Sequence, residues 1–471
     1  MRLFLEKYMN MPAIITEEEI ITYSDFKKRI FSMCSNLVDV GIKRGDKVAV
    51  FSQNSWEYVV CILALLYIGA IVVPVSTRWP QLQVENALIN VGCNFMLISK
   101  NIPFSIHGIK TFCLEDMVLY ISRPSFQNDY IDITNDNEAT IIFTSGSSGR
   151  PKAALHTLKN HYYSALGSNM NINFGPGDIW GIFLPFYHVG GLSIIFRAII
   201  SGGAIAISTK KEPLYISIKK MNISHVSLVP TQLYRIIKSN IKLDILKNLK
   251  AILLGGAPAR EKLVKTAKDM DFPIFTTYGS TEMASQITTT KPYDTLKHLL
   301  TSGKILPYRE LKIADDGEIM VRGKTLFKGY INKRDLEKPF TKEGWFRTGD
   351  IGYIDKDGYL NVIGRKDNMF ISGGENIQPE EIEKSIANLK DIIDVIVVPV
   401  EDIEWGYRPV AFVWSDKHIN EDYIKKRLEN YLPRYKIPDR IFNVAKDIKN
   451  KGLKLNREQF KRLAKRIMER A

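Results

Sequence analysis

Residues 144–152 read T-S-G-S-S-G-R-P-K, and these residue types at this spacing are suited to binding phosphate. Glycines allow backbone N–H groups to turn toward an anion, hydroxyls add donors, and Arg150 and Lys152 supply positive charge. The apolar, β-rich residues 139–143 come first, so a strand would end in this loop. An ordinary surface loop is the alternative, since serine and glycine clusters often form one. The candidate phosphate-binding residues are Thr144, Ser145, Gly146, Ser147, Ser148, Gly149 and Lys152.

Residues 278–282, Y-G-S-T-E, offer an aromatic face, hydroxyls and a carboxylate directly after a β-like segment. The aromatic face suits stacking on a base, a hydroxyl suits a phosphate oxygen, and the carboxylate suits Mg²⁺. Asp350 follows a glycine in the run R-T-G-D, and its carboxylate could accept hydrogen bonds from a ribose diol. A lone Gly-Asp or Gly-Gly pair is more often an ordinary turn. The order and spacing of the runs therefore matter more than any one of them.

An alternation of helical and strand-like segments over the first three quarters of the chain would position these runs. Residues 46–51 and 251–254 have the pattern of strands, and residues 56–67 have the pattern of a buried helix. Such alternation predicts an α/β fold with mostly parallel sheets flanked by helices, in which ligands gather at the carboxyl ends of the strands.

Length and pattern together predict more than one domain. The 471 residues exceed the size at which a single core stops growing. A turn-rich β region precedes residue 364, and a compact α+β pattern follows it. We predict a large N-terminal domain with a β-rich subdomain over residues 1–364, and a small, mobile α+β domain over residues 365–471.

The net charge of +14 admits a nucleic-acid-binding protein as one interpretation. However, the lysines are scattered among acidic residues, and no helix-turn-helix, zinc or RNA-binding signature is evident. A basic groove would equally steer small polyanions such as nucleotides, so we expect no nucleic-acid partner. The four cysteines are widely separated, which indicates a reducing compartment and supports neither a zinc site nor a disulfide framework.

One apolar run, residues 58–75, could be taken for a membrane span. Gly69 and Pro74 interrupt it, and residues 71–73 are β-branched, which fits a buried helix, a turn and a buried strand better. Glu6 breaks the apolar start that a signal peptide would need. We therefore expect a cytoplasmic protein without an integral membrane span.

Taken together, these runs resemble the motifs of the adenylate-forming superfamily of acyl-CoA ligases, peptide-synthetase adenylation domains and luciferases. The resemblance extends over nearly the whole chain, from Y-S-D-F at residues 23–26 to Lys454. Within the superfamily, the chain is most similar to the o-succinylbenzoate–CoA ligases of menaquinone synthesis. That likeness lies in Y-G-S-T-E-M-A-S-Q-I-T-T-T (278–290), L-P-Y-R-E-L-K-I (306–313) and I-S-G-G-E-N-I-Q-P (371–379).

The resemblance implies ATP-dependent activation of a carboxylic acid. The acid would become an acyl-adenylate with release of pyrophosphate, and the thiol of coenzyme A would then displace AMP. Holding a triphosphate, Mg²⁺ and two anionic reactants together requires cations and backbone donors more than acid–base groups. The expected partners are a small carboxylic acid, ATP and coenzyme A, and homo-oligomerisation is left open.

The resemblance also implies roles for the nucleotide-binding residues. Residues 144–152 would hold the β- and γ-phosphates, Thr281 would contact the α-phosphate, and Glu282 would bind Mg²⁺. The residues implied to enclose adenine are Gly255, Gly256, Ala257 and Tyr278, and those implied to bind the ribose hydroxyls are Asp350 and Arg365.

Positions in the small domain receive roles from the same resemblance. Asp367 matches the hinge about which this domain would pivot, and Gly373 and Gly374 would line a narrow pantetheine tunnel that side chains would obstruct. The family's adenylation lysine usually follows a glycine directly, whereas a leucine intervenes in this chain. Lys454 keeps the family's distance to the following arginine and is assigned the role, with Lys451 as the alternative.

The acyl substrate would lie near His188 and Arg197. His188 matches the family's histidine or aromatic residue beside the acyl pocket, and a satisfied core histidine is the alternative. Arg197 lies in an apolar segment, where a cation is costly to bury without a partner. It would face the pocket and offset the aryl carboxylate of o-succinylbenzoate, with Ser227 and Thr288 as weaker candidates to assist. Alternatively, Arg197 reaches the surface or pairs with an internal acid.

The leading hypothesis is therefore a ligase that forms o-succinylbenzoyl-CoA, AMP and pyrophosphate. A general fatty or aryl acid–CoA ligase is the alternative in the same class, and a catalytically silent nucleotide-binding protein is the alternative in another. The near-complete motif set favours an enzyme. The candidate catalytic residues are Lys454, Thr281, Glu282 and His188.

Overall fold

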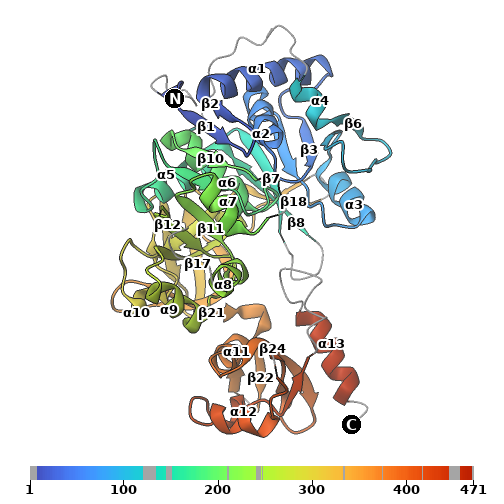
Figure 1. Ribbon diagram of the computed structural model, residues 1–471. Coiled ribbons are helices and arrows are strands. Elements are labelled where there is room, and N and C mark those ends of the chain that lie inside the picture. Colours follow the sequence, from blue (N-terminus) through green and yellow to red (C-terminus); the bar gives the residue numbers. More distant parts are fainter. Residues whose placement is uncertain are drawn as a thin grey trace.

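The computed structural model describes residues 8–119, 134–144, 151–208, 210, 212–239, 246, 248–332, 335–373, 375–415, 417–444 and 457–468. Within these residues the chain forms a large N-terminal domain with three sheets and a smaller C-terminal domain with a fourth (Figure 1). The α/β fold class with a small α+β C-terminal domain is confirmed.

The first sheet has nine strands, of which the six from β13 to β1 run parallel. Strand β12 is buried along its whole length, as expected for a parallel strand covered by helices on both faces. In spatial order the strands are β15 (Lys304–Ile305), β14 (Ser285–Thr289), β13 (Ile274–Ser280), β12 (Ala251–Leu254), β11 (His225–Leu228), β9 (Ile179–Gly181), β10 (Ala204–Ala206), β1 (Pro12–Ile15) and β2 (Ile20–Thr22).

The second sheet has eight strands and combines a parallel part with an antiparallel edge. Strands β7, β4, β3, β5 and β6 are parallel, whereas β8, β18 and β19 each pair antiparallel with their neighbours. In spatial order the strands are β19 (Asp335–Glu337), β18 (Gly329–Asn332), β8 (Lys152–Thr157), β7 (Glu138–Thr144), β4 (Ile71–Pro74), β3 (Lys47–Phe51), β5 (Phe95–Ile98) and β6 (Lys110–Cys113).

The apolar run at residues 58–75 folds as the sequence predicts, into a buried helix, a turn and a buried strand. Helix α2 (Trp56–Ile68) begins after Ser55, whose side chain accepts a hydrogen bond from the backbone N–H of Tyr58. It ends at Gly69, which has a left-handed conformation, and β4 follows. None of the helices in the described ranges is long and apolar enough to cross a membrane.

Helices cover the two large sheets of the N-terminal domain (Figure 1). They are α1 (Tyr23–Asp39), α2 (Trp56–Ile68), α3 (Gln81–Val91), α4 (Leu114–Leu119), α5 (Leu158–Asn171), α6 (Val189–Ser201), α7 (Leu214–Lys220), α8 (Pro230–Lys238), α9 (Glu261–Asp269) and α10 (Leu296–Leu299), with the short 3₁₀ helix η3 (Thr281–Met283).

A four-stranded antiparallel sheet forms the expected β-rich subdomain and leads to the C-terminal domain. Its last strand is followed by the 3₁₀ helix η4 (Lys366–Asn368), which contains the candidate hinge. The strands of this sheet are β16 (Arg309–Ile313), β17 (Glu318–Gly323), β20 (Phe346–Ile354) and β21 (Leu360–Arg365).

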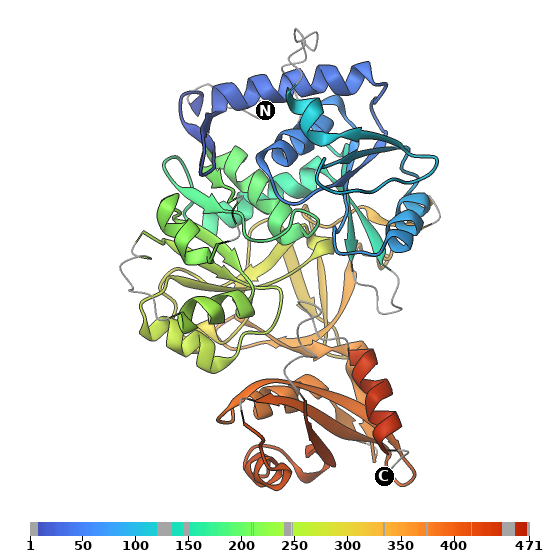
Figure 2. The same ribbon diagram turned by 45° about the vertical axis from the view of Figure 1, so that its right-hand side comes forward.

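The C-terminal domain has its own apolar core, which contains residues from 370 onward. Helix α13 (Arg457–Met468) covers one face of its sheet, whereas α11 (Pro379–Ala387) and α12 (Glu421–Leu428) pack on the other (Figure 2). Its elements are β22 (Phe370–Ser372), β23 (Glu375–Ile377), α11 (Pro379–Ala387), β24 (Ile392–Asp402), β25 (Gly406–Ser415), α12 (Glu421–Leu428), η5 (Arg434–Lys436), β26 (Arg440–Asn443) and α13 (Arg457–Met468).

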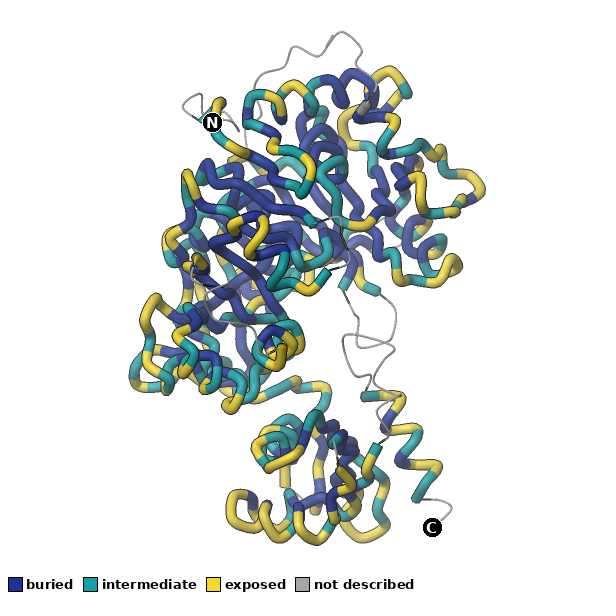
Figure 3. The backbone as a smooth tube through the Cα atoms, in the orientation of Figure 1, coloured by how far each residue is buried: buried dark blue, intermediate teal, exposed yellow. Residues whose placement is uncertain are grey.

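Buried backbone follows the sheets of both domains, and exposed backbone lies mainly on loops and outer helices (Figure 3). Separate cores favour the boundary expected between residues 364 and 365, which stays a prediction, as does the mobility of the small domain.

Candidate active site

The candidate phosphate loop connects two strands that pair with each other. Thr144 ends β7, Lys152 begins β8, and the two residues are register partners. The Nζ atom of Lys152 lies 5.1 Å from the ring centroid of Tyr330, in the neighbouring strand β18. The remaining loop residues lie outside the described part of the chain, so their role stays a prediction; they are Ser145, Gly146, Ser147, Ser148 and Gly149.

Glu282 joins the same cluster from another element. It lies in η3, directly after β13, and its Oε1 atom accepts a 2.6 Å hydrogen bond from the hydroxyl of Tyr330. Desolvation, and then the negative charge of Glu282, raise the pKa of Tyr330 above its ordinary value. The phenol therefore stays protonated and donates. A single carboxylate near a candidate phosphate-binding cation would suit Mg²⁺, which keeps several waters and also binds phosphate oxygens.

Thr281 is held by a buried histidine of the strand that carries Lys152. The Nε2 atom of His156 lies 2.7 Å from the carbonyl oxygen of Thr281. A carbonyl oxygen only accepts, so Nε2 carries the proton. Burial lowers the pKa of His156 to about 4, which keeps the ring neutral at physiological pH. The hydrogen bond fixes η3 to β8, and so fixes two candidate site segments to each other.

Tyr278, Asp350 and Arg365 are far apart in the sequence and meet in the structure. The hydroxyl of Tyr278 donates to Oδ2 of Asp350 at 2.6 Å, and Nη1 of Arg365 donates to Oδ1 of Asp350 at 3.1 Å. Burial and the negative charge of Asp350 raise the pKa of Tyr278 well above its ordinary value. Gly349 has a φ of +73°, and a Cβ atom there would lie 2.7 Å from Nη2 of Arg365. An aromatic ring, a carboxylate and a guanidinium are thus gathered where a nucleoside was predicted to bind.

Gly255, Gly256 and Ala257 follow β12, at the same sheet edge as the end of the parallel strand β13. A Cβ atom on Gly255 would lie 2.7 Å from Cγ2 of Thr277, and Gly256 has a φ of +80°. Both positions therefore favour glycine on local grounds. Their predicted contact with adenine stays a prediction.

His188 lies just before the first residue of helix α6, and Arg197 lies in the C-terminal half of that helix. His188 precedes the first turn and is exposed, and partial desolvation, followed by the positive charge of Arg78, lowers its pKa. Arg197 comes nine residues later, about 13 Å along the helix axis. The two residues thus occupy different parts of any acyl-binding region.

Arg197 is a buried cation with incomplete hydrogen bonding, and only 1% of it is exposed. Its Nη2 atom donates to Oε1 of Gln286 at 2.9 Å and to Oγ of Ser285 at 3.2 Å. Its guanidinium carbon lies 4.9 Å from the ring centroid of Trp180. No described residue accepts a hydrogen bond from its Nε or Nη1 atom. The alternative that Arg197 reaches the surface is therefore wrong.

Ser227 and Thr288 differ in their relation to Arg197. Ser227 accepts a 3.2 Å hydrogen bond from Nε1 of Trp180, the residue whose ring lies against the guanidinium. Thr288 donates instead to the backbone oxygen of Ser302 at 2.5 Å. Ser227 is thus linked to Arg197 through one ring, whereas the assisting role of Thr288 rests on sequence alone.

The small-domain candidates are described only in part. Gly373 has a φ of +56°, its N–H donates to the carbonyl of Trp405, and a Cβ atom there would collide with the Trp405 ring. Asp367 lies in η4, 3.5 Å from Nη2 of Arg365. Gly374, Lys451 and Lys454 lie outside the described ranges, so the tunnel and the adenylation lysine stay predictions.

Sequence reasoning missed several residues of these clusters. Tyr330 reaches the phosphate loop only because β18 pairs with β8, a contact between segments about 180 residues apart. Gln286 and Ser285 lie within the run that carries the family likeness, but nothing local shows that they face Arg197. A buried arginine in an apolar helix was the available signal that polar partners must exist.

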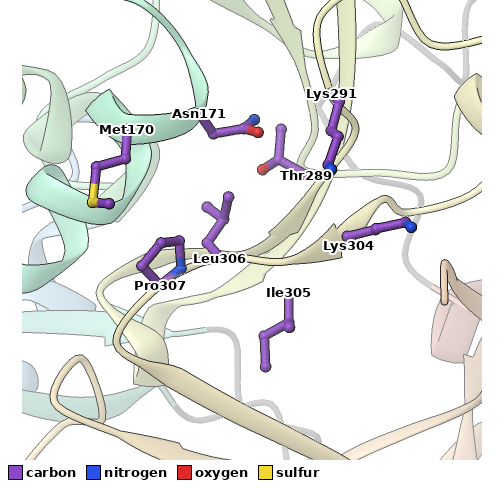
Figure 4. A pocket seen from close by; sticks show the side chains of 8 residues that line it. All are labelled: Met170, Asn171, Thr289, Lys291, Lys304, Ile305, Leu306 and Pro307. Carbon is purple, nitrogen blue, oxygen red and sulfur yellow. The ribbon is translucent and has the colours of Figure 1, made fainter.

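A separate surface pocket of about 210 Å³ lies between the end of α5 and strands β14 and β15 (Figure 4). Lys291 and Lys304 supply its positive charge. None of the candidate site residues lines it, so it is distinct from the clusters described above. Its lining residues are Met170, Asn171, Thr289, Lys291, Lys304, Ile305, Leu306 and Pro307.

Comparisons with known proteins show similar chains. The chain is 34% identical to the 2-succinylbenzoate–CoA ligase of Geobacillus sp. (strain WCH70), over 98% of both chains. It resembles the solved o-succinylbenzoate CoA synthetase from Bacillus subtilis in complex with the acyl-adenylate intermediate OSB-AMP, with a TM-score of 0.87, 29% identity and coverage of 97% of this chain and 96% of that one.

The same synthetase in complex with ATP and magnesium ion matches with a TM-score of 0.84 and 29% identity, over 92% of this chain and 93% of that one. The family model for the AMP-binding enzyme matches residues 2–331, and that for the AMP-binding enzyme C-terminal domain matches residues 381–452. The chain therefore belongs to the AMP-binding enzyme family.

Proposed function

We propose that the protein is an AMP-forming acid–thiol ligase that converts o-succinylbenzoate to o-succinylbenzoyl-CoA. In the first half-reaction a carboxylate oxygen of the acid attacks the α-phosphorus of ATP, and pyrophosphate leaves. In the second, the thiol of coenzyme A attacks the acyl carbon, and AMP leaves with the bonding electron pair. Family membership and the similarity to 2-succinylbenzoate–CoA ligases support this reaction.

The observation that favours this particular acid is the buried, incompletely satisfied Arg197. O-succinylbenzoate has two carboxylates, and the ligase activates one of them. The other stays ionised at neutral pH and must be desolvated on binding. The free donors of Arg197 would offset that cost through charge-assisted hydrogen bonds, and the anion would in turn stabilise the buried guanidinium.

The nucleotide residues have separate proposed tasks. Lys152 and the loop before it would bind the β- and γ-phosphates, and Thr281 would contact the α-phosphate. Asp350, held by Tyr278 and Arg365, would accept hydrogen bonds from the ribose. Mg²⁺ at Glu282 would neutralise phosphate charge.

The roles in the small domain are proposed from the family likeness. Lys454 would promote adenylation, and the Gly373–Gly374 turn would serve thioester formation after the domain pivots near Asp367. The protein is also proposed to act in the cytoplasm, in menaquinone synthesis.

The main competing function is ligation of fatty or uncharged aryl acids. Such a monoacid would leave the guanidinium of Arg197 buried without an anion, at a cost of several kcal/mol by analogy with other unpaired buried charges. A catalytically silent nucleotide-binding protein would have no need to keep this cation. The buried arginine thus favours a diacid ligase over both alternatives.

A pyrophosphate-release assay with and without coenzyme A tests the proposal. The acids are o-succinylbenzoate, 3-benzoylpropionate (the same molecule without its aryl carboxylate) and a medium-chain fatty acid. We expect the diacid to be used with the highest kcat/KM, and coenzyme A to convert a slow first turnover into steady turnover. Equal or better use of either monoacid would replace the diacid ligase by a general acyl-CoA ligase. Absence of pyrophosphate release with every acid would favour a silent protein.

A further inference from the structure

Two buried arginines, Arg197 and Arg309, meet at one residue, Gln286. The side-chain oxygen of Gln286 accepts from Arg197, and its backbone oxygen accepts from Nε of Arg309 at 2.6 Å. Arg309 also donates to the backbone oxygens of Pro307 and Ser164, at 2.7 and 3.1 Å. Neutral carbonyls therefore hold Arg309, and through it the backbone of Gln286 is held in place.

The amide of Gln286 has only one orientation that satisfies its neighbours. A guanidinium has no acceptor, so the atom that faces Arg197 must be the oxygen Oε1. The Nε2 atom then donates to Oγ1 of Thr289 at 2.7 Å. Gln286 is thus fixed at both ends, and its oxygen points at Nη2 of Arg197.

The backbone before Gln286 is shaped for this contact. Ala284 and Ser285 have φ values of +51° and +118°, which non-glycine residues seldom adopt. Strand β14 also contains a bulge at Ile287, since Gln286 and Thr288 pair with the consecutive residues Gly279 and Tyr278 of β13. The turn and the bulge together place the side chains of Ser285 and Gln286 against one guanidinium nitrogen.

Gln286 is uncharged, whereas the usual partner of a buried arginine is a carboxylate. No carboxylate within the described ranges forms an ion pair with Arg197 or Arg309. An amide oxygen orients a guanidinium, but it leaves the full positive charge available to another anion. A carboxylate at the same position would orient and neutralise it together.

We propose that Gln286 is a positioning residue that sets substrate specificity through Arg197: it aligns the guanidinium while leaving its charge for the second carboxylate of a diacid. This inference rests on the proposed function. It extends that function by naming the residue that keeps the cation selective for dianionic acids. A ligase with glutamate at this position would accept uncharged aryl acids instead.

The test compares Gln286→Glu and Gln286→Leu with the wild type on o-succinylbenzoate and 3-benzoylpropionate. Glutamate has nearly the same shape, and the hydroxyl of Thr289 can rotate to donate to it. In Gln286→Glu we expect the KM for the diacid to rise about tenfold or more, with kcat changed by less than about threefold. The KM for the monoacid should stay the same or fall. In Gln286→Leu the guanidinium loses one acceptor, and the KM for the diacid should rise about threefold to tenfold.

A double-mutant cycle shows whether Gln286 acts through Arg197. In the Arg197→Leu background, Gln286→Leu should leave the ratio of kcat/KM values for the two acids unchanged, because the residue it aligns is gone. Asn36→Asp, which also replaces a buried amide by a carboxylate, is the matched control and should not change that ratio. Thermal unfolding of each variant monitors stability.

The outcomes separate the two proposals. If the wild type does not prefer the diacid, the proposed function fails, and the inference fails with it. If the wild type prefers the diacid and Gln286→Glu keeps the same preference, only the inference is overturned. An equal loss with both acids in Gln286→Leu, or the same loss with and without Arg197, would show a purely structural role and would also overturn it.

Discussion

The hydroxyl of Tyr330 donates a 2.6 Å hydrogen bond to the carboxylate of Glu282, and the ring of Tyr330 lies beside the ammonium group of Lys152. One tyrosine thus connects the candidate metal ligand to the candidate phosphate loop. The hydrogen bond limits the directions in which the oxygens of Glu282 can point. Metal ligands held in this way bind more tightly than unsupported ones.

Glu282→Gln removes the charge with little change of shape. We expect turnover to fall about a hundredfold or more, and the response to Mg²⁺ to weaken, because phosphate charge is no longer neutralised at this position. Tyr330→Phe keeps the carboxylate and loses only its support, so it should require about tenfold more Mg²⁺ for half-maximal activity. Titrating Mg²⁺ in the pyrophosphate assay measures both. Wild-type Mg²⁺ dependence in Glu282→Gln would remove this residue from the site.

Lys454 is expected to serve only the first half-reaction. Lys454→Ala should slow acyl-adenylate formation at least a hundredfold, because a cation that stabilises the transition state is lost. A supplied acyl-adenylate should still react with coenzyme A at nearly the wild-type rate. Lys451→Ala is the matched comparison and should have little effect on either step. The reverse result for the two lysines would move the assignment to Lys451.

Asp367→Pro tests the hinge. Proline fixes φ and restricts the residue before it, so one backbone state is favoured at this position. We expect overall turnover to fall more than the rate of either half-reaction measured alone, because the change between states becomes limiting. Wild-type turnover would argue against a pivot here.

Arg260 and Asp394 connect the two domains directly. Arg260 precedes α9, and its Nη2 atom lies 3.0 Å from Asp394 in β24 of the small domain. Its Nη1 atom donates to the carbonyl oxygen of Ile392 at 3.0 Å. We predict that this pair stabilises the arrangement of the two domains used before thioester formation.

Arg260→Met should therefore slow acyl-adenylate formation a few-fold without slowing thioester formation. A double-mutant cycle with Asp394→Asn should give a coupling of about 0.5–1 kcal/mol, typical of a partly exposed ion pair. Rapid-quench measurement of each half-reaction provides both numbers. Equal slowing of the two half-reactions would show that the pair does not favour one arrangement.

His156 makes the stability of the protein sensitive to acid. Its pKa is 6.5 when exposed and is lowered by burial to about 4, so the folded state resists protonation. The stability that this neutral histidine contributes is complete above pH 6.5 and is lost as the pH falls toward 4, by up to about 3 kcal/mol. Urea unfolding between pH 7 and 4.5 should show this decrease. In His156→Gln, which can still donate to Thr281, the slope should be smaller, and an unchanged slope would exclude His156 as its source.

Local sequence patterns predicted the residues at strand ends but not their distant partners. The run at residues 278–282 and the glycines after β12 follow strands that are recognisable from apolar, β-branched segments. The contact of Tyr330 with Glu282 depends on the order of strands in a sheet, which no local pattern specifies. The contact of Gln286 with Arg197 depends on a β-bulge and a strained turn, which sequence spacing does not reveal.

Arg197→Leu is the substitution that separates the diacid ligase from a general acyl-CoA ligase. Leucine fits the apolar surroundings of α6 and removes a charge that has no anionic partner among the described residues, so the folded protein should be as stable as the wild type or more stable. The same change removes the partner proposed for the aryl carboxylate of o-succinylbenzoate. We expect kcat/KM for the diacid to fall about a hundredfold or more, mainly through KM. For 3-benzoylpropionate, kcat/KM should stay the same or rise, because no second carboxylate has to be desolvated.

Arg260→Met, which removes a cation outside the acyl region, should leave the ratio of the kcat/KM values for the two acids unchanged. Wild-type use of the diacid by Arg197→Leu would show that this cation is not its binding partner, and the assignment of the substrate would then lose its structural basis.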